Sequence, residues 1–110
     1  LEDALYQRGQ VNLEELRYPD AATAFSELIS SKPNSPFLPY ALEGRAVANF
    51  SQQRYAETVA DYKLILDNHP AADNAETALK GLQEALALQE NSEEFGVYLQ
   101  AYKNANPGVG

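Results

Sequence analysis

The sequence has no cysteine among its 110 residues and only one histidine. Without thiols, neither a disulfide framework nor a thiolate metal site or thiol nucleophile is available. The single histidine, His69, directly precedes Pro70, where an imidazole interacts favourably with the last carbonyl groups of a helix. Adjacent carboxylates such as Glu14 and Glu15 point to different sides of a helix and form no dyad. We therefore expect no enzyme activity, no cofactor and no metal site.

Basic residues and long apolar runs are also scarce. The chain has 8 Lys and Arg residues against 16 Asp and Glu residues, which gives a net charge of -8. A surface that follows a phosphate backbone needs clustered positive charge, so nucleic acid is not an expected partner. No apolar run approaches the roughly 20 residues that a membrane span requires, and membrane insertion is not expected.

What the sequence does contain is a repeat with a period of 37 residues. The pair Ala4-Leu5 recurs as Ala41-Leu42 and again as Ala78-Leu79. Two helical patterns per period of this length are typical of a helical solenoid. We expect a single domain over residues 1–110, built from repeats at about 2–35, 36–72 and 73–107. Each repeat ends in a proline at the same position, namely Pro33, Pro70 and Pro107.

Apolar residues at helical spacing predict two antiparallel helices in each repeat. In the first repeat we expect a helix from about Asp3 to Leu16 and another that starts near Pro19. In the second repeat the helices are expected to start near Pro39 and to run from about Arg54 to Asn68. The residues expected to face inward include Leu5, Gly9, Leu13, Leu16, Ala21, Phe25, Leu28, Leu42, Ala46, Phe50, Tyr55, Val59, Tyr62, Ile65, Leu66, Ala75, Leu79, Leu82 and Leu86.

Charged residues are expected at the surface or at helix ends. In the second repeat, Glu57, Asp61, Lys63 and Asp67 fall opposite the apolar stripe and are expected to be solvated. Asp73 is the expected N-cap of the third repeat. The last helix is expected to carry Phe95, Tyr98, Leu99 and Tyr102 inward.

The spacing of these residues resembles the signature of the tetratricopeptide repeat. The first unit has Leu5, Gly9, Tyr18, Ala21, Phe25 and Pro33 at the signature positions, and the second has Leu42, Ala46, Tyr55, Tyr62 and Pro70. The third unit is degenerate, with Gln83 and Phe95 where small residues are expected. The 37-residue period with a Pro-Asn-Ser-Pro linker is similar to the long-loop repeats of bacterial envelope proteins. These include outer-membrane assembly lipoproteins and the periplasmic partner of the Tol-Pal system, so the resemblance suggests a periplasmic or outer-membrane-associated location.

The resemblance implies an all-α fold, an α-solenoid of three stacked helix-turn-helix repeats with six helices. It also implies a non-catalytic scaffold that binds a protein partner, as a peptide or a helix, in a concave groove lined by the first helix of each repeat. The polar clamp for a C-terminal carboxylate is absent, which favours an apolar partner. The sequence leaves open whether Tyr6 and Tyr40 contact a partner or pack internally. The predicted groove residues are Tyr6, Gln10, Leu13, Tyr40, Glu43, Val47, Phe50, Lys80, Glu84 and Leu88.

Two features suggest an alternative role as a structural spacer or self-association segment of a longer repeat array. The sequence starts Leu1-Glu2-Asp3 instead of with Met, as expected for a fragment or for a chain whose start was removed. The final helix also has more apolar residues than one stripe can hold, and Val97 and Ala101 are expected to face outward. A following repeat would be expected to cover them. In isolation this patch could pair with a second copy as a homodimer.

Overall fold

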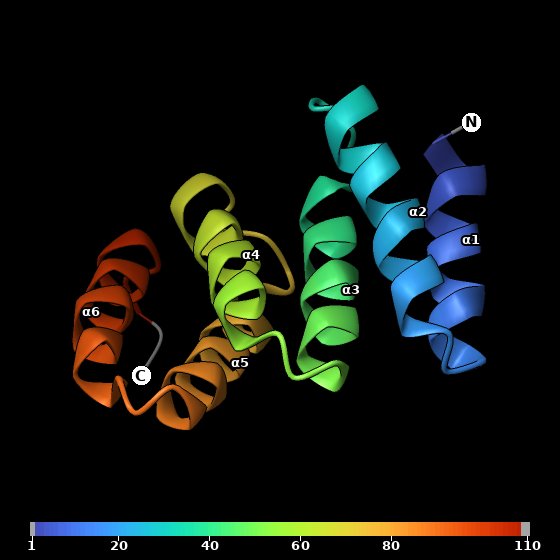
Figure 1. Ribbon diagram of the computed structural model, residues 1–110. Coiled ribbons are helices and arrows are strands. Elements are labelled where there is room, and N and C mark those ends of the chain that lie inside the picture. Colours follow the sequence, from blue (N-terminus) through green and yellow to red (C-terminus); the bar gives the residue numbers. More distant parts are fainter. Residues whose placement is uncertain (1, 109–110) are drawn as a thin grey trace.

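Helices form every regular element of residues 2–108, the part of the chain that the computed structural model describes (Figure 1). The prediction of an all-α stack with six α-helices is confirmed for these residues. In Figure 1 the helices follow one another across the molecule in chain order, from α1 on the right to α6 on the left. Their bounds are α1 Glu2–Glu14, α2 Tyr18–Ser31, α3 Leu38–Ser51, α4 Tyr55–Asn68, α5 Ala75–Leu88 and α6 Phe95–Ala105, with a 3-10 turn, η1, at Ser92–Glu94.

Each helix packs against the next one along the chain, and α1 also contacts α3 directly. The α3 helix is shared between two apolar clusters, because its small residues face both ways. Ala41 and Ala48 join Phe25 and its neighbours in the first cluster. Leu42 and Ala46 join the second cluster, which continues through α4 to α5. Burial on both sides of α3 therefore links the first helical pair to the rest of the chain.

The turn inside each helical pair has the same backbone geometry three times. Leu16, Gln53 and Glu90 lie 37 residues apart and adopt left-handed φ angles of 62°, 62° and 59°. In each turn the next residue's N–H donates to the carbonyl five residues before it, as from Arg17 to Asn12, at 2.8 Å in all three cases. This is the 6→1 bond of a Schellman motif, which ends a helix and usually places glycine at the left-handed position. The backbone repeats here although the three side chains differ.

The connections between pairs repeat as well. The residues after α2, α4 and α6 are Lys32, His69 and Asn106, with φ angles of -133°, -137° and -130°. The N–H of Ser35 donates to the carbonyl of Lys32, and Ala72 donates to His69 in the same way. His69 therefore stands at the end of a helix, as predicted. The 37-residue period is therefore present in the backbone conformation as well as in the amino-acid sequence.

An aromatic ring fills the space between consecutive pairs. The ring of Phe25 lies so close to Gly9 and Gly44 that a Cβ atom on either glycine would sit 2.5 Å from ring carbons. Tyr62 occupies the same place one repeat later, where a Cβ on Gly81 would also meet the ring at 2.5 Å. Real Cβ atoms do not approach other carbons so closely, and these glycines allow the helices to pack onto the rings. Phe25 and Tyr62 were predicted to face inward, and both are buried.

Several predictions about individual residues were wrong. Leu16 is 68% exposed instead of inward, because α1 ends at Glu14 and the left-handed turn directs Leu16 away from the helical face. Asp73 does not cap α5, since Asn74 is the N-cap residue and makes no side-chain cap bond. Val97 is 70% exposed, as predicted. However, Ala60, which matches Val97 in the second pair, is also exposed although α5 packs against that pair. Leu64, which matches Ala101, is exposed as well.

The largest correction concerns Asp61, which was predicted to be solvated but is only 3% exposed. Both of its carboxylate oxygens accept hydrogen bonds from Arg45, from Nε at 2.9 Å and from Nη2 at 2.7 Å. The Nη1 of Arg45 donates to Ser26 Oγ on α2 at 3.0 Å. Burial raises the pKa of the Asp61 carboxyl, and the Arg45 guanidinium acts in the opposite direction. This network joins α2, α3 and α4 beside the apolar clusters.

We predict that Gln53→Gly stabilises the protein by about 0.5–1 kcal/mol, because glycine reaches the left-handed region without the steric cost that other residues have there. The measurement is urea unfolding followed by circular dichroism. Gln52→Gly is the matched control, since Gln52 has a φ of -94° and donates a side-chain bond to the Ala48 carbonyl. The control should destabilise. Equal effects of the two changes would contradict the role of the left-handed turn.

We predict that Asp61→Ala destabilises the protein by about 3 kcal/mol, because it leaves the Arg45 guanidinium partly desolvated without its counter-charge. Replacing both partners, as Arg45→Met with Asp61→Leu, should return the free energy of unfolding to within about 1 kcal/mol of the parent. Both values are read from urea unfolding curves. A loss below about 0.5 kcal/mol for Asp61→Ala would mean that the pair behaves as an exposed surface ion pair.

Candidate functional site

The first helix of each pair contributes side chains to one surface, which we call the first-helix face and define by Tyr6 on α1, Tyr40 and Glu43 on α3, and Glu84 on α5. The carboxylate of Glu43 acts on several neighbouring tyrosines. It helps to raise the pKa of Tyr6, Tyr40 and Tyr62. The fold therefore brings Tyr6 and Tyr40, two of the predicted groove residues, close to Glu43.

Tyr6 is both a packing residue and a surface residue. Its ring stacks on Phe37 with centroids 5.1 Å apart and planes at 21°, and it tilts against Phe25 at 5.9 Å. The side chain remains half-buried. Burial raises the pKa of its hydroxyl first of all, followed by the charge of Glu43. The Tyr6 ring is thus held rigidly at the surface, and a rigid aromatic loses little conformational entropy when a partner binds.

Tyr40 and Glu43 connect the face to the start of α5. The Tyr40 hydroxyl donates to Asp73 Oδ2 at 3.4 Å. Asn74 Nδ2 donates to Glu43 Oε1 at 2.8 Å and to the Pro39 carbonyl at 3.0 Å. Asp73 and Asn74 therefore support the face from the linker between pairs. Reading the sequence missed this role, because a polar residue before a helix is more often its cap.

Tyr62 lies beneath the same surface. Burial raises the pKa of Tyr62 to about 12, and the carboxylates of Glu43 and Glu84 act in the same direction. Two acidic side chains from successive first helices are therefore near one tyrosine. The face therefore combines aromatic rings with negative charge, and the chain as a whole also has a negative net charge, -8.

The other predicted groove residues divide between surface and interior. Val47 is 37% exposed and Leu88 is 50% exposed, so both present apolar atoms to solvent. Leu13 packs against the first apolar cluster, and Phe50 meets the edge of Tyr55 with centroids 5.4 Å apart. The side chain of Gln10 is half-buried.

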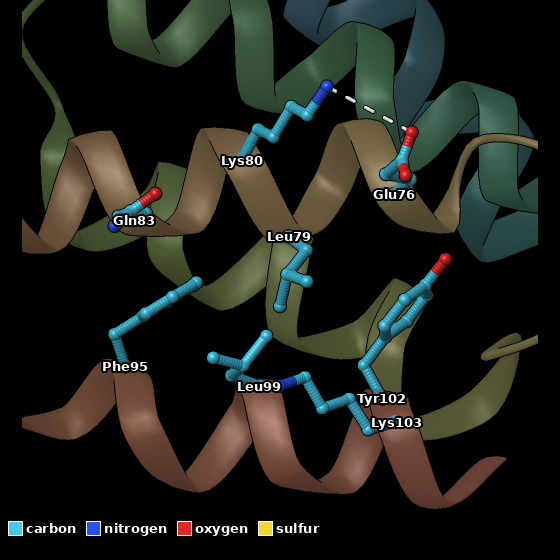
Figure 2. Close-up of a pocket in the computed structure, with 8 residues that line it drawn as sticks. All are labelled: Glu76, Leu79, Lys80, Gln83, Phe95, Leu99, Tyr102 and Lys103. Carbon is cyan, nitrogen blue, oxygen red and sulfur yellow. Dashed lines mark ion pairs between the residues drawn. The ribbon is translucent and has the colours of Figure 1, made fainter. Parts of the chain in front are cut away.

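Lys80 is the residue of α5 that matches Glu43 on α3 and Tyr6 on α1, 37 and 74 residues earlier. It lies 3.9 Å from Glu76 Oε1 and lines a cavity of about 270 Å³ between α5 and α6 (Figure 2). This cavity was not identified from the sequence. Its α6 wall consists of Phe95, Leu99 and Tyr102, which were predicted to pack inward and which do pack, half-buried, against the second apolar cluster.

The described part of the chain has side chains of the kind that bind other polypeptides. Among residues 2–108, no group of three or more His, Asp or Glu side chains is placed to hold a metal ion. None of the helices in this range has both the length and the apolar character needed to cross a membrane. Rigid aromatics, exposed aliphatic side chains and carboxylates can recognise another polypeptide through packing and charge.

Comparison with known families agrees with the first helical pair. Residues 3–35, which include most of α1 and all of α2, match the family model described as a tetratricopeptide repeat. A search of curated proteins with the whole chain finds no match. The family match supports a tetratricopeptide repeat protein, and repeats of this family generally mediate protein–protein interactions and are typically non-catalytic.

Proposed function

We propose that this chain is a non-catalytic scaffold that binds a peptide or helix of a protein partner on the first-helix face. The proposal treats residues 2–35, 36–72 and 73–107 as three tetratricopeptide-like repeats of one domain. The observation that carries it is the cluster of Tyr6, Tyr40 and Glu43, in which aromatic rings and a carboxylate from successive first helices share one surface. Aromatic residues are enriched among those that dominate binding energy at interfaces.

The exposed aliphatic residues extend this surface. Val47 is on the same helix as Tyr40, two turns further along, and Leu88 is near the end of α5. Together with the tyrosines they offer apolar contacts along the first helices. Such contacts suit an amphipathic helix or an extended peptide with spaced apolar side chains.

Charge narrows the class of partner. Glu43, Glu84 and Asp73 lie on or beside the face, and the chain has twice as many acidic as basic residues. A peptide with Lys or Arg beside its apolar side chains would be attracted to this surface and oriented by it. We therefore propose a basic, apolar segment as the ligand. Its association rate should fall as the salt concentration rises.

The resemblance to long-loop repeats further suggests that the full protein acts in a bacterial envelope, in the periplasm or at the outer membrane. Self-association through Val97 is the competing role, but the matching residue of the second pair, Ala60, is exposed as well. The two roles use different surfaces, because Val97 is on α6 and the first-helix face is formed by α1, α3 and α5.

We predict that Val47→Glu weakens peptide capture by at least about fivefold, a change of about 1 kcal/mol in binding free energy. The cost of burying a carboxylate in an apolar contact should exceed its attraction to a Lys or Arg residue of the peptide. The measurement is selection of a random peptide library on the immobilised chain, followed by titration of the selected peptides. Leu64→Glu is the matched control, since Leu64 on α4 is 39% exposed and Val47 is 37% exposed.

Both variants should melt close to the parent, since both side chains are at the surface. Selected peptides enriched in Lys or Arg that lose affinity for Val47→Glu alone would support the proposal. Equal loss for both variants, or no selected peptide, would contradict it. Concentration-dependent dimers that disappear in Val97→Lys would favour self-association instead.

A further inference from the structure

The cavity between α5 and α6 is an open apolar groove at the C-terminal end of the stack. We call it the end groove and define it by Leu79, Lys80 and Gln83 on α5 and by Phe95, Leu99 and Tyr102 on α6. Figure 2 shows the three α6 side chains directed toward α5, and Leu79 directed back toward them. The salt bridge between Lys80 and Glu76 lies on the opposite side of α5 from these apolar side chains (Figure 2).

The same positions in the earlier pairs are covered by a helix. Moving back 37 residues from Leu79, Gln83 and the three α6 positions leads to buried side chains. All of these except Thr58 lie in one cluster with residues of α5. Moving back another 37 leads to residues buried beneath α3. In contrast, no residue of α6 is buried. The matching residues are Leu42, Ala46, Thr58, Tyr62 and Ile65 in the second pair, and Leu5, Gly9, Ala21, Phe25 and Leu28 in the first.

The two helices that cover these earlier grooves share a sequence pattern. Residues 41–44 of α3 read Ala-Leu-Glu-Gly, and residues 78–81 of α5 read Ala-Leu-Lys-Gly. The alanines are fully buried. The glycines, Gly44 and Gly81, rest on the rings of Phe25 and Tyr62. This type of groove therefore accommodates a helix that carries Ala-Leu and, two residues later, a small residue that faces the ring.

The end groove differs from the earlier two at the central position. Leu99 stands where Phe25 and Tyr62 stand in the first two pairs. A leucine side chain does not reach as far as an aromatic ring. In the first two pairs the ring fills the space up to the glycine of the next helix, whereas beyond Leu99 this space is free for a side chain of the bound helix. The flanking positions carry the larger side chains Phe95 and Tyr102. The occupant should therefore present an apolar side chain larger than glycine opposite Leu99, between these two rings.

The N-terminal face of a second copy does not suit this site well. At the positions of α1 that match Ala41, Gly44 and Arg45 are Ala4, Gln7 and Arg8, and all three are exposed. The amide of Gln7 would then take the place of glycine in an apolar groove without an identified partner, which is unfavourable.

We propose that the end groove binds an amphipathic α-helix of a partner protein. This helix carries Ala-Leu, as α3 and α5 do, and two residues after the leucine it has a large aliphatic residue in place of glycine. Lys103, on the groove's rim, favours acidic residues at the edge of that helix. The bound helix would continue the stack in the way that α3 follows the first pair and α5 follows the second. This site is independent of the proposed ligand surface on the first helices.

The probes are two acetylated and amidated peptides of residues 73–90, one with the natural Gly81 and one with Gly81→Leu, each carrying a fluorescent label. Fluorescence anisotropy is measured as the intact chain is added. We expect the leucine peptide to bind the parent at least about tenfold more tightly than the glycine peptide. Because leucine also favours the helical state of the free peptide, this ratio alone does not decide the question.

The Leu99→Tyr variant separates the two causes, because it restores the ring found in the first two pairs. It should weaken binding of the leucine peptide by about tenfold, the effect of overpacking by 1–2 kcal/mol, and should not weaken binding of the glycine peptide. Lys103→Glu, at an exposed position that cannot disturb the core, should weaken both acidic peptides severalfold at low salt. Val47→Glu on the first-helix face should change neither titration.

Three results would overturn the proposal. The first is the absence of saturable binding by either peptide. The second is a Leu99→Tyr variant that has an unchanged melting curve and still binds the leucine peptide more tightly than the glycine peptide, as the parent does. The third is light scattering in which the chain alone forms concentration-dependent oligomers that Leu99→Tyr abolishes, since the groove would then take a second copy. A failure of Val47→Glu to affect library peptides would contradict the first-helix site and leave this one unaffected.

Discussion

The ring of Phe25 between Gly9 and Gly44 is the contact on which the stacking of this molecule depends. One face of the ring touches α1 of its own pair and the other touches α3 of the next pair. The helices can approach to this distance only because both positions lack a side chain. Tyr62 repeats the contact against Gly81, and the fold extends by placing one ring and one glycine per step. The third pair has Leu99 in place of the ring, and the repeated contact ends there.

The period and the apolar stripes were enough to predict six helices and the positions of their ends to within a few residues. The left-handed turns at Leu16, Gln53 and Glu90 could not be predicted, because no glycine marks them and only the hydrogen-bond pattern reveals them. Asp61 could not be predicted as buried either. Its helical position is on the polar side, and its burial depends on Arg45 reaching it from another helix.

The candidate surfaces show the same limit of sequence reasoning. Helical spacing places Tyr6, Tyr40 and Glu43 on first helices, but their closeness depends on how the pairs stack. The supporting residues Phe37, Asp73 and Asn74 come from linkers, where no periodicity exists to guide a prediction. The end groove became visible only when burial was compared at equal positions of the three pairs. That comparison also indicates that the exposed position of Val97 is an ordinary feature of the second helices, since Ala60 is exposed too.

The most direct test of the stacking contact is a double-mutant cycle between Phe25 and Gly44, with the free energy of unfolding measured in urea. Phe25→Leu shortens the side chain, and Gly44→Ala adds a methyl group where the ring now lies. The helix propensity gained by Gly44→Ala cancels in the cycle. If the ring fills the space above the glycine, the double variant should be more stable than the sum of the single changes by about 1 kcal/mol or more. Additivity to within about 0.3 kcal/mol would contradict the account.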